Sequence, residues 1–543
     1  MICLSHICRE MQFLCNVSWV KLGCLFTSTR FLSLRFYRFV LLRTNSFLLQ
    51  ILYFIALSSI GFWLLGILKQ REPARNLDLF FTSVSAATVS SMSTVEMEAF
   101  SNAQLVVLTV LMFVGGEVFT SMVGLYLRSC RLRLLLKKAD KVASVDSDGS
   151  VRSTNQADED VVVEQIELGL SQMSRSFGPD HFDYLRYISI KFLASVVLVY
   201  QVAVQAVGVA MVSIYFKLVS RSRKVLKDKG LKLLTFSVFT TVSTFASCGF
   251  VPTNENMIVF GRDSFLLLIL IPQVLLGNTL FPSCLRLILW GLDRWCTSHG
   301  DIPSYLLRNS REIGYLHLLP GLHSRLLVVT VFAFIGVQFA LFCAMQWSSS
   351  VLSGLSSSYE KIVAVLFQCV NTRHTGETVV DLSQLAPAIL VLFVVMMYLP
   401  PYTSFLPVKG GVGGRRSPEA GRANEPIRIR GEVVENLIFS QLSYLAMFVI
   451  LVCITERQSM KKDPLNFNVL SIVVEVISAY GNVGFTMGYS CARQLHPDAA
   501  CTDKWFGFVG KWTDGGKVVL IAVMIFGRLK KFNMNGGRGW KLL

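Results

Sequence analysis

The stretch Leu233–Ala246, LLTFSVFTTVSTFA, is apolar, and the turn Ser247-Cys248-Gly249-Phe250 follows it directly. It is too short to cross a bilayer, because spans need about 17–25 residues and apolar runs of about 10–14 are typical of re-entrant or interfacial segments. Three more short apolar segments end in small-residue turns: Leu79–Thr88, Ile362–Val370 and Asn468–Ala479. Longer apolar segments flank each of them, so a unit of span, short segment, turn and span occurs four times.

The longer apolar segments predict eight transmembrane helices. The first, Phe47–Leu68, contains no charge, and at a rise of about 1.5 Å per residue it matches a hydrocarbon core of about 30 Å. The others are Gln104–Leu127, Phe192–Phe216, Phe265–Phe281, Leu326–Cys343, Leu385–Leu399, Leu437–Thr455 and Lys517–Arg528. The predicted fold class is therefore an all-α polytopic membrane protein.

The composition excludes a soluble protein and a nucleic-acid-binding protein. Of 543 residues, 52% are hydrophobic and only 16% are charged, whereas soluble domains carry about 25% charged residues. The net charge is +17, but Lys and Arg lie mainly between the apolar segments and form no basic domain with interleaved aromatic residues. Most cysteines lie within apolar stretches without metal-ligand spacing, although Cys491 and Cys501 share an expected extracellular loop and can pair.

Hydropathy also divides the chain into segments. We expect a cytoplasmic N-terminus without a cleaved signal peptide over 1–46, and then repeat 1 over 47–128. The remaining segments are a polar cytoplasmic loop (129–188), repeat 2 (189–290), a cytoplasmic loop (291–324), repeat 3 (325–404), a basic cytoplasmic loop (405–432), and repeat 4 with the C-terminus (433–543).

The distribution of basic residues predicts the orientation. Lys and Arg are concentrated before the first span, after the second, and in both connections on either side of the third unit, which places these regions in the cytoplasm. The four short segments then enter the membrane from outside. The basic stretch Lys217–Lys232 conflicts with this assignment, because it would be extracellular.

The four turns suggest a pathway for ions. A cation that enters a bilayer loses its hydration, and non-helical backbone at membrane depth is tolerated only where it lines a cavity or is buried in protein. Inward carbonyl groups replace the lost water oxygens, and glycine accepts the positive φ angles that such turns need. A single glycine more often makes a tight turn only, but four coincident units favour a pore. No catalytic motif occurs in a credible setting, so we predict neither an enzyme nor a cofactor.

The turns closely resemble one family. The strings Ser85–Glu98, Ser247–Asn256, Asn371–Glu377 and Gly481–Thr486 resemble the plant high-affinity potassium transporters, which are relatives of the bacterial and fungal Trk and Ktr transporters. The resemblance covers roughly residues 47 to 540. It implies eight transmembrane helices as four membrane–pore-loop–membrane repeats around one central pore, and a homodimer in which each protomer has its own pore.

The resemblance also implies one selectivity-filter residue per repeat. These residues are Ser91, Gly249, Gly376 and Gly484, whose neighbouring backbone carbonyls would bind sodium. Ser-Gly-Gly-Gly resembles the sodium-selective subfamily, whereas four glycines are usual in sodium–potassium symporters, although some members with serine are assigned to that second group. The Ser91 hydroxymethyl group would disturb a four-fold carbonyl cage suited to potassium; the alternative is that Ser91 serves the turn alone.

Each charged residue near the membrane can have a role in ion conduction or an ordinary structural role. In the family, a basic residue on the last span lies beneath the filter, which makes Arg528 a candidate pore barrier; the alternative is a cytoplasmic flanking charge beside Lys530. We expect Glu117 to face protein and pair with a basic or backbone group. His374 is interpreted as packing behind a turn rather than as a pH gate.

Glutamates follow three of the turns. Glu377 and Glu255, together with Glu96 and Glu98, are candidates for an acidic outer vestibule that concentrates cations. The plain alternative is that they are solvated surface charges.

The predicted function is passive, channel-like uptake of sodium across the plasma membrane, with sodium retrieval as its role in a plant. Its partners would be sodium ions, the lipid bilayer and a second copy of the chain. One alternative is a sodium–potassium symporter or a potassium-permeable transporter. The alternative from another class is a polytopic receptor or scaffold, which predicts no current.

Overall fold

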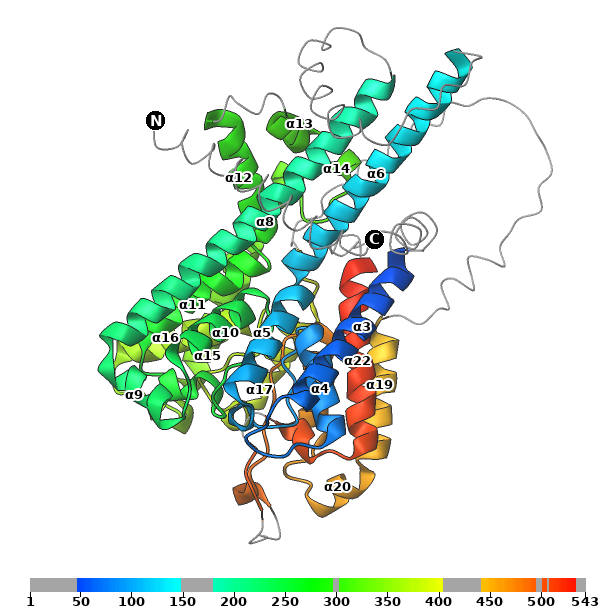
Figure 1. Ribbon diagram of the computed structural model, residues 1–543. Helices are drawn as coiled ribbons and strands as arrows, with labels where there is room; N and C mark the ends of the chain where they lie inside the picture. The colour runs from blue at the N-terminus through cyan, green and yellow to red at the C-terminus, as the bar shows by residue number, and fades with distance from the viewer. Residues whose placement is uncertain are drawn as a thin grey trace, which may run out of the picture. The chain divides into compact units, whose positions relative to one another are not determined.

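The computed structural model describes residues 46–147, 179–295, 302–403, 441–494, 501–504 and 507–533. Within these ranges the protein is helical, and its only extended pairing is an isolated antiparallel bridge between Tyr489 and Lys504 (Figure 1). The predicted N-terminal segment 1–46 lies outside the described residues except for residue 46. The predicted basic loop 405–432 and the start of the span expected from Leu437 also lie outside them.

The first unit contains four helices: α3 (Ser46–Ile67), α4 (Asn76–Ala87), α5 (Asn102–Gly115) and α6 (Glu117–Ser147). The span expected at Gln104–Leu127 is thus two helices, which meet at an angle of 54°. Gly116 separates them with extended backbone angles, φ −58° and ψ 149°. Helix α6 also continues into the predicted loop 129–188 as far as Ser147.

The second unit contains α8 (Pro179–Leu218), α9 (Ser220–Asp228), α10 (Leu233–Phe245), α11 (Ser264–Gly277) and α12 (Phe281–Trp295). Helix α8 begins inside the predicted loop 129–188. The span expected at Phe265–Phe281 corresponds to α11, and α12 follows it after a bend of 79°. The short predicted segment is α10 and differs from its expected range by one residue at its C-terminal end.

The third and fourth units complete the chain. The third has α13 (Ile302–Arg308), α14 (Ser310–Ile313), α15 (Gly321–Gln346), α16 (Ser358–Asn371) and α17 (Pro387–Tyr398). The fourth has α19 (Gln441–Thr455), α20 (Arg457–Lys462), α21 (Val469–Gly481) and α22 (Asp514–Asn533). The 3₁₀ helices are Met97–Ala99, Asn256–Phe260, Ser350–Leu352, Leu382–Gln384, Cys491–Arg493 and Phe508–Lys511.

Three described helices are long and apolar enough to span a membrane by themselves: Leu48–Ile67, Tyr184–Leu218 and Gly321–Gln346. Counting each bent pair as one span raises the number to five. Helix α3 exposes Leu52, Ile60 and Trp63, as expected for a helix in contact with lipid. The predicted count of eight spans stays a prediction.

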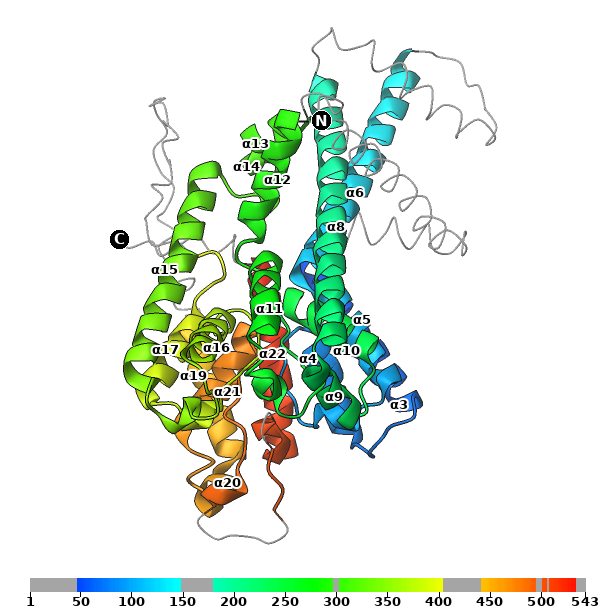
Figure 2. The same ribbon diagram turned by 90° about the vertical axis from the view of Figure 1, so that its left-hand side faces the viewer.

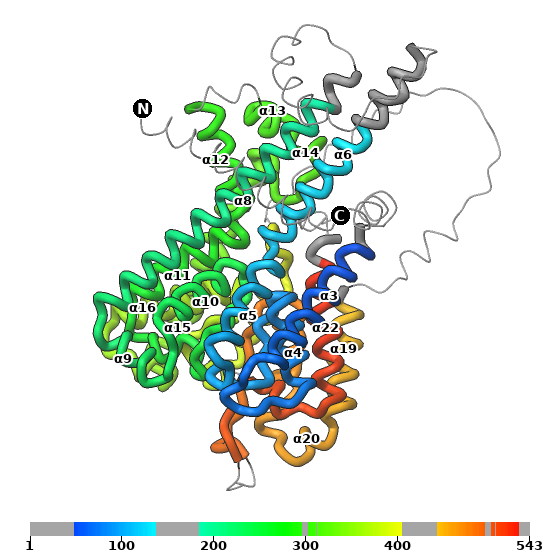
Figure 3. The backbone as a smooth tube through the Cα atoms, in the orientation of Figure 1, coloured from blue at the N-terminus to red at the C-terminus, as the bar shows by residue number. Residues whose placement is uncertain are grey.

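The chain divides into two compact units. One contains the described residues of Ser121–Tyr200 and Arg286–Leu318; the other contains those of Asn45–Thr120, Gln201–Leu285 and Leu319–Leu543. In the first, Arg128 donates a hydrogen bond to the carbonyl of Ile313. The second holds all four short helices and their turns, and there α22 packs on α3 and α4, α10 packs on α5, and α15 packs on α16 (Figures 2 and 3).

The short helices are largely buried inside this second unit. In α10, Phe236, Phe239 and Phe245 are each almost completely buried. Three of the short helices also end against a glycine of the next α-helix along the chain, and the contacting pairs are Gly115 with Ala87, Gly277 with Phe245, and Gly527 with Tyr480. A Cβ atom at these glycines would lie 2.8–2.9 Å from the carbonyl carbon of the partner. The close approach of the two backbones therefore requires glycine at these three positions.

In the third repeat, a different contact holds the end of the short helix α16. Beyond the end of α16, the Arg373 guanidinium donates hydrogen bonds to the carbonyls of Pro400 and Pro401 and lies 4.9 Å from the ring of Phe334. A charged side chain thus takes the place of the glycine contact.

Candidate ion-conducting site

The turns after α4, α10 and α21 share one backbone conformation. Each has two residues in the left-handed region, separated by one residue; the pairs are Val89 and Ser91, Ser247 and Gly249, and Asn482 and Gly484. The φ angles at the second position are 52°, 95° and 99°. The third turn differs, because the φ angle of Gly376 lies outside this region. Ser91 is the non-glycine residue at this position, and it adopts the conformation at some cost in strain.

Serine hydroxyls hold two of the turns. The Gly249 N–H donates to Ser243 Oγ at 3.1 Å, and the Gly484 N–H donates to Ser478 Oγ at 3.0 Å. Both serines lie six residues before their glycine and still belong to the short helix. Each helix end therefore determines the position of its own turn.

The structure brings the four predicted filter residues together. A Cβ on Gly249 would lie 2.6 Å from the Gly376 Cα, and a Cβ on Gly376 would lie 2.8 Å from the Gly484 carbonyl oxygen. The Ser91 Oγ would be 2.9 Å from a Cβ on either Gly376 or Gly484. The Gly376 N–H also donates to the Cys248 carbonyl at 3.3 Å. There is thus no room for three more side chains at this constriction.

A small cavity adjoins the constriction. Its lining includes Ser91, Gly249, Gly484 and Thr486, and it encloses about 20 Å³, which is room for about one water molecule. Its lining also includes Glu96 and Asn254.

Asn256 is a residue of this site that sequence reasoning did not single out. Its Nδ2 donates to the Gly376 carbonyl at 3.0 Å, and its Oδ1 accepts from the N–H groups of Met257 and Thr378. It is buried and has φ 54°. Asn256 therefore connects the second turn to the third, a role that its position in the sequence does not reveal.

Two of the glutamates predicted for an outer vestibule, Glu377 and Glu255, have polar partners. Glu377 is fully buried, and Thr244 of α10 donates its hydroxyl hydrogen to the Glu377 carboxylate. It therefore does not lie on an open surface. Glu255 forms an ion pair with Lys229 at 2.6 Å.

Glu96 and Glu98 are also paired. Lys504 lies 3.6 Å from the Glu96 carboxylate, and Lys229 lies 2.5 Å from that of Glu98. Burial raises the pKa of Glu96, and the Lys504 charge partly offsets the increase. Lysines therefore compensate the charges of Glu96, Glu98 and Glu255.

Arg528 is buried, with 1% of its surface exposed. Its guanidinium donates to the Gly115 carbonyl at the end of α5 and lies 5.7 Å from the ring of Phe54. It also interacts electrostatically with Glu117, the first residue of α6. A solvated flanking charge does not have these surroundings, and the expectation that Glu117 pairs with a basic group agrees with them.

His374 packs behind the third turn. It is 2% exposed, its Nε2 lies 2.8 Å from Thr279 Oγ1, and its Nδ1 lies 2.6 Å from the Val370 carbonyl. Both ring nitrogens are thus engaged by buried groups, in agreement with the packing interpretation.

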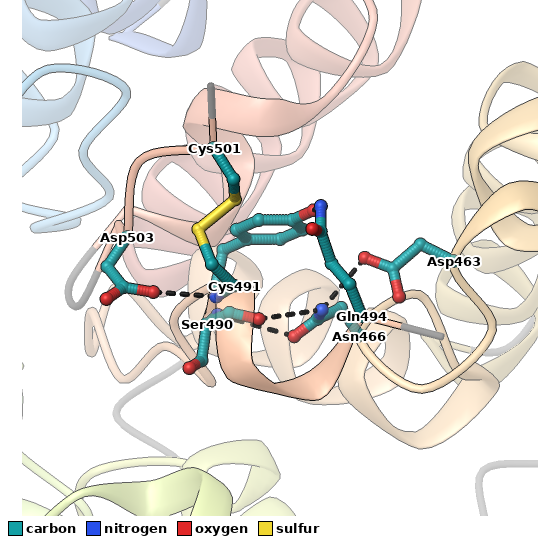
Figure 4. The surroundings of a disulfide bond; sticks show 8 residues. Asp463, Asn466, Ser490, Cys491, Gln494, Cys501 and Asp503 are labelled. Carbon is teal, nitrogen blue, oxygen red and sulfur yellow. Dashed lines mark hydrogen bonds between the residues drawn. A yellow bond between two sulfur atoms is a disulfide. The ribbon is translucent and has the colours of Figure 1, made fainter. Parts of the chain in front are cut away.

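A disulfide between Cys491 and Cys501 closes the loop before α22 (Figure 4). The Cys491 N–H donates to Asp503 at 2.6 Å, and Asn466 donates to the Ser490 carbonyl at 3.1 Å. The adjacent bridge between Tyr489 and Lys504 fixes the backbone of the lysine that pairs with Glu96.

Comparisons with known proteins find similarity to cation transport proteins. The family model TrkH, described as a cation transport protein, matches residues 164–534. The rice (Oryza sativa subsp. japonica) protein named "Probable cation transporter HKT1;4" is 51% identical, and the match covers 91% of this chain and 97% of that one. The Arabidopsis thaliana protein named "Sodium transporter HKT1" is 49% identical over 88% of this chain and 91% of its own. The crystal structure of the potassium transporter TrkH from Vibrio parahaemolyticus is 16% identical, with a TM-score of 0.47 and coverage of 97% and 96%.

Proposed function

The chain belongs to the TrkH family of cation transport proteins, and from this premise we propose that it is a sodium-selective transporter of the plasma membrane. Sodium would enter passively, driven by a membrane potential that contributes about 2.3 kcal/mol per charge per 100 mV. The observation that carries the proposal is the convergence of Ser91, Gly249, Gly376 and Gly484 beside a cavity for one ion.

The proposed architecture is one central pore formed by four repeats with eight membrane-spanning segments. Its support is the recurrence of a short buried helix followed by a turn, with the same left-handed pattern in three of the four turns. The proposed repeat boundaries remain those inferred from hydropathy, and a homodimer is proposed from the family resemblance. Arg528 would act as a cationic barrier on the intracellular side of the turns.

The selectivity for sodium rests on Ser91. Its Oγ approaches the backbone positions of both Gly376 and Gly484, so one quadrant of the ring carries a side chain and a hydroxyl. Such an asymmetric, narrower ring favours the smaller ion. The name "Sodium transporter HKT1" of one relative supports the same selectivity.

Replacing Ser91 with glycine is expected to admit potassium. The substitution removes the hydroxymethyl group from the ring and relieves a residue held at φ 52°, so the fold should tolerate it. Two-electrode voltage clamp in oocytes would measure reversal potentials while external sodium and potassium are exchanged. The reversal potential of the wild type should shift by about 59 mV for each tenfold change in external sodium concentration. The reversal potential of Ser91→Gly should shift with both sodium and potassium.

Ser91→Ala is the matched control, because it keeps the Cβ atom and removes only the hydroxyl. A wild type that already follows potassium would assign the chain to the sodium–potassium class. A wild type that reaches the surface without any current would contradict the pore itself and favour a receptor or scaffold.

A further inference from the structure

Lys229 brings a positive charge to the mouth of the candidate pathway. It lies between α9 and α10, within the basic stretch that conflicts with the predicted orientation. Its Nζ is 2.5 Å from Glu98 Oε1 and 2.6 Å from Glu255 Oε2. Because Glu98 follows the first turn and Glu255 follows the second, one ammonium group joins two of the four units.

The contacts of Lys229 continue to the wall of the cavity. Glu98 Oε1 also accepts from the Asn254 N–H at 3.0 Å, and the Glu98 N–H donates to Asn254 Oδ1 at 3.0 Å. Asn254 lines the cavity beside Ser91 and Gly249. The charge of Lys229 is therefore separated from the cavity wall by one residue.

The balance of charge at the mouth depends on this lysine. Glu96, Glu98 and Glu255 face two ammonium groups, Lys229 and Lys504. Burial alone would lower the pKa of Lys229, but its hydrogen bonds to Glu255 and Glu98 and their charges outweigh that effect and raise the pKa. Lys229 thus stays charged throughout the physiological range.

We infer that Lys229 sets the apparent affinity for external cations, by neutralising Glu98 and Glu255 where ions approach the cavity. This inference rests on the proposed transport function and assigns Lys229 a positioning and electrostatic role outside the filter. Without its charge, the mouth carries one more net negative charge, which raises the local cation concentration. Selectivity should not change, because the ion pairs of Lys229 are with Glu98 and Glu255 and not with the predicted filter residues.

The first test is Lys229→Gln in oocytes under voltage clamp, with the protein at the surface quantified by biotinylation. The external sodium concentration for half-maximal current should fall about twofold, and the reversal potential should stay unchanged. The effect should grow at low ionic strength, because the Debye length rises from about 10 Å at 0.1 M to about 30 Å at 0.01 M. Lys229→Arg should behave as wild type, and Lys227→Gln is the control at an exposed lysine two residues away.

A charge-balanced pair separates electrostatics from damage to the fold. Lys229→Gln/Glu255→Gln restores the net charge and should return the half-maximal concentration to the wild-type value. Glu255→Gln alone should raise it about twofold; since this carboxylate is half-exposed, that variant decides the matter if Lys229→Gln does not reach the surface.

An unchanged or raised half-maximal concentration in surface-expressed Lys229→Gln, or an unchanged one in Glu255→Gln, would overturn the inference while leaving sodium transport intact. A surface-expressed wild type without current would overturn the proposed function instead, and this inference with it.

Discussion

Replacing Gly249 with alanine is expected to abolish the sodium current and to leave the protein at the cell surface. Gly249 has φ 95°, a conformation that costs an L-residue on the order of 1–3 kcal/mol. The new Cβ would also lie 2.6 Å from the Gly376 Cα and 3.0 Å from the Glu377 nitrogen. Both neighbours are backbone atoms, so relief requires the turns to separate.

The expected current is below about a tenth of the wild-type value, because 1.4 kcal/mol already corresponds to a factor of ten. Voltage clamp with surface biotinylation measures both quantities. Gly336→Ala is the matched control, since a Cβ at that position in α15 would meet no atom within 4 Å. Normal sodium currents from Gly249→Ala would show that conduction does not depend on this turn.

Gly484→Ala adds a sharper comparison. Its Cβ would overlap the Ser91 side chain and would lie 2.9 Å from the Ser90 carbonyl oxygen. Combining it with Ser91→Gly removes the first conflict and leaves the second, together with the strain at φ 99°. The double variant should therefore recover part of the current, and identical currents in the single and double variants would refute the proposed contact.

The second large effect is expected from Lys517→Met. Lys517 of α22 pairs with Asp78 in the first turn of α4 at 2.7 Å, and the two side chains are only 4% and 11% exposed. Removing one partner leaves a buried charge without compensation, which costs about 3–5 kcal/mol. We expect a lower melting temperature in detergent and less protein at the surface.

A neighbouring ion pair provides the control. Arg75 and Asp514 connect the same two helix starts, but their side chains are 62% and 59% exposed. Asp514→Asn should therefore change the melting temperature little, because exposed pairs are screened by water and salt. Asp78→Asn/Lys517→Met should recover much of the loss. Equal losses from Asp514→Asn and Lys517→Met would contradict the argument from burial.

Hydropathy predicted the local elements of this protein well. The segment expected at Leu233–Ala246 is α10, Leu233–Phe245, because the turn residues on either side of a short apolar run limit where its helix can begin and end. The break at Gly116 was not predicted. Hydropathy predicts the length of an apolar segment but not its contacts with other helices. The bend at Gly116 accompanies such a contact, that of Gly115 with Ala87 in another helix.

The candidate site was predicted in its residues but not in its contacts. The four turn positions were identified by their small residues and by family resemblance, and they do lie together. The surroundings of Glu377 were not foreseen, because its position beside a turn suggests an open mouth, whereas Thr244 binds it in a buried place. The roles of Asn256 and Lys229 were missed because each has a partner in another repeat, Gly376 for Asn256 and Glu98 for Lys229.

The sequence by itself determined the class of protein, its short apolar segments and the positions of the four turns that follow them, because apolar length and small-residue turns act over a few neighbouring residues. The tertiary structure alone decided which charges meet. Asp78 and Lys517 are 439 residues apart in the chain, and Lys229 of repeat 2 pairs with Glu98 of repeat 1. Ion pairs and cavity walls depend on distances in space, and only the packed helices define those distances.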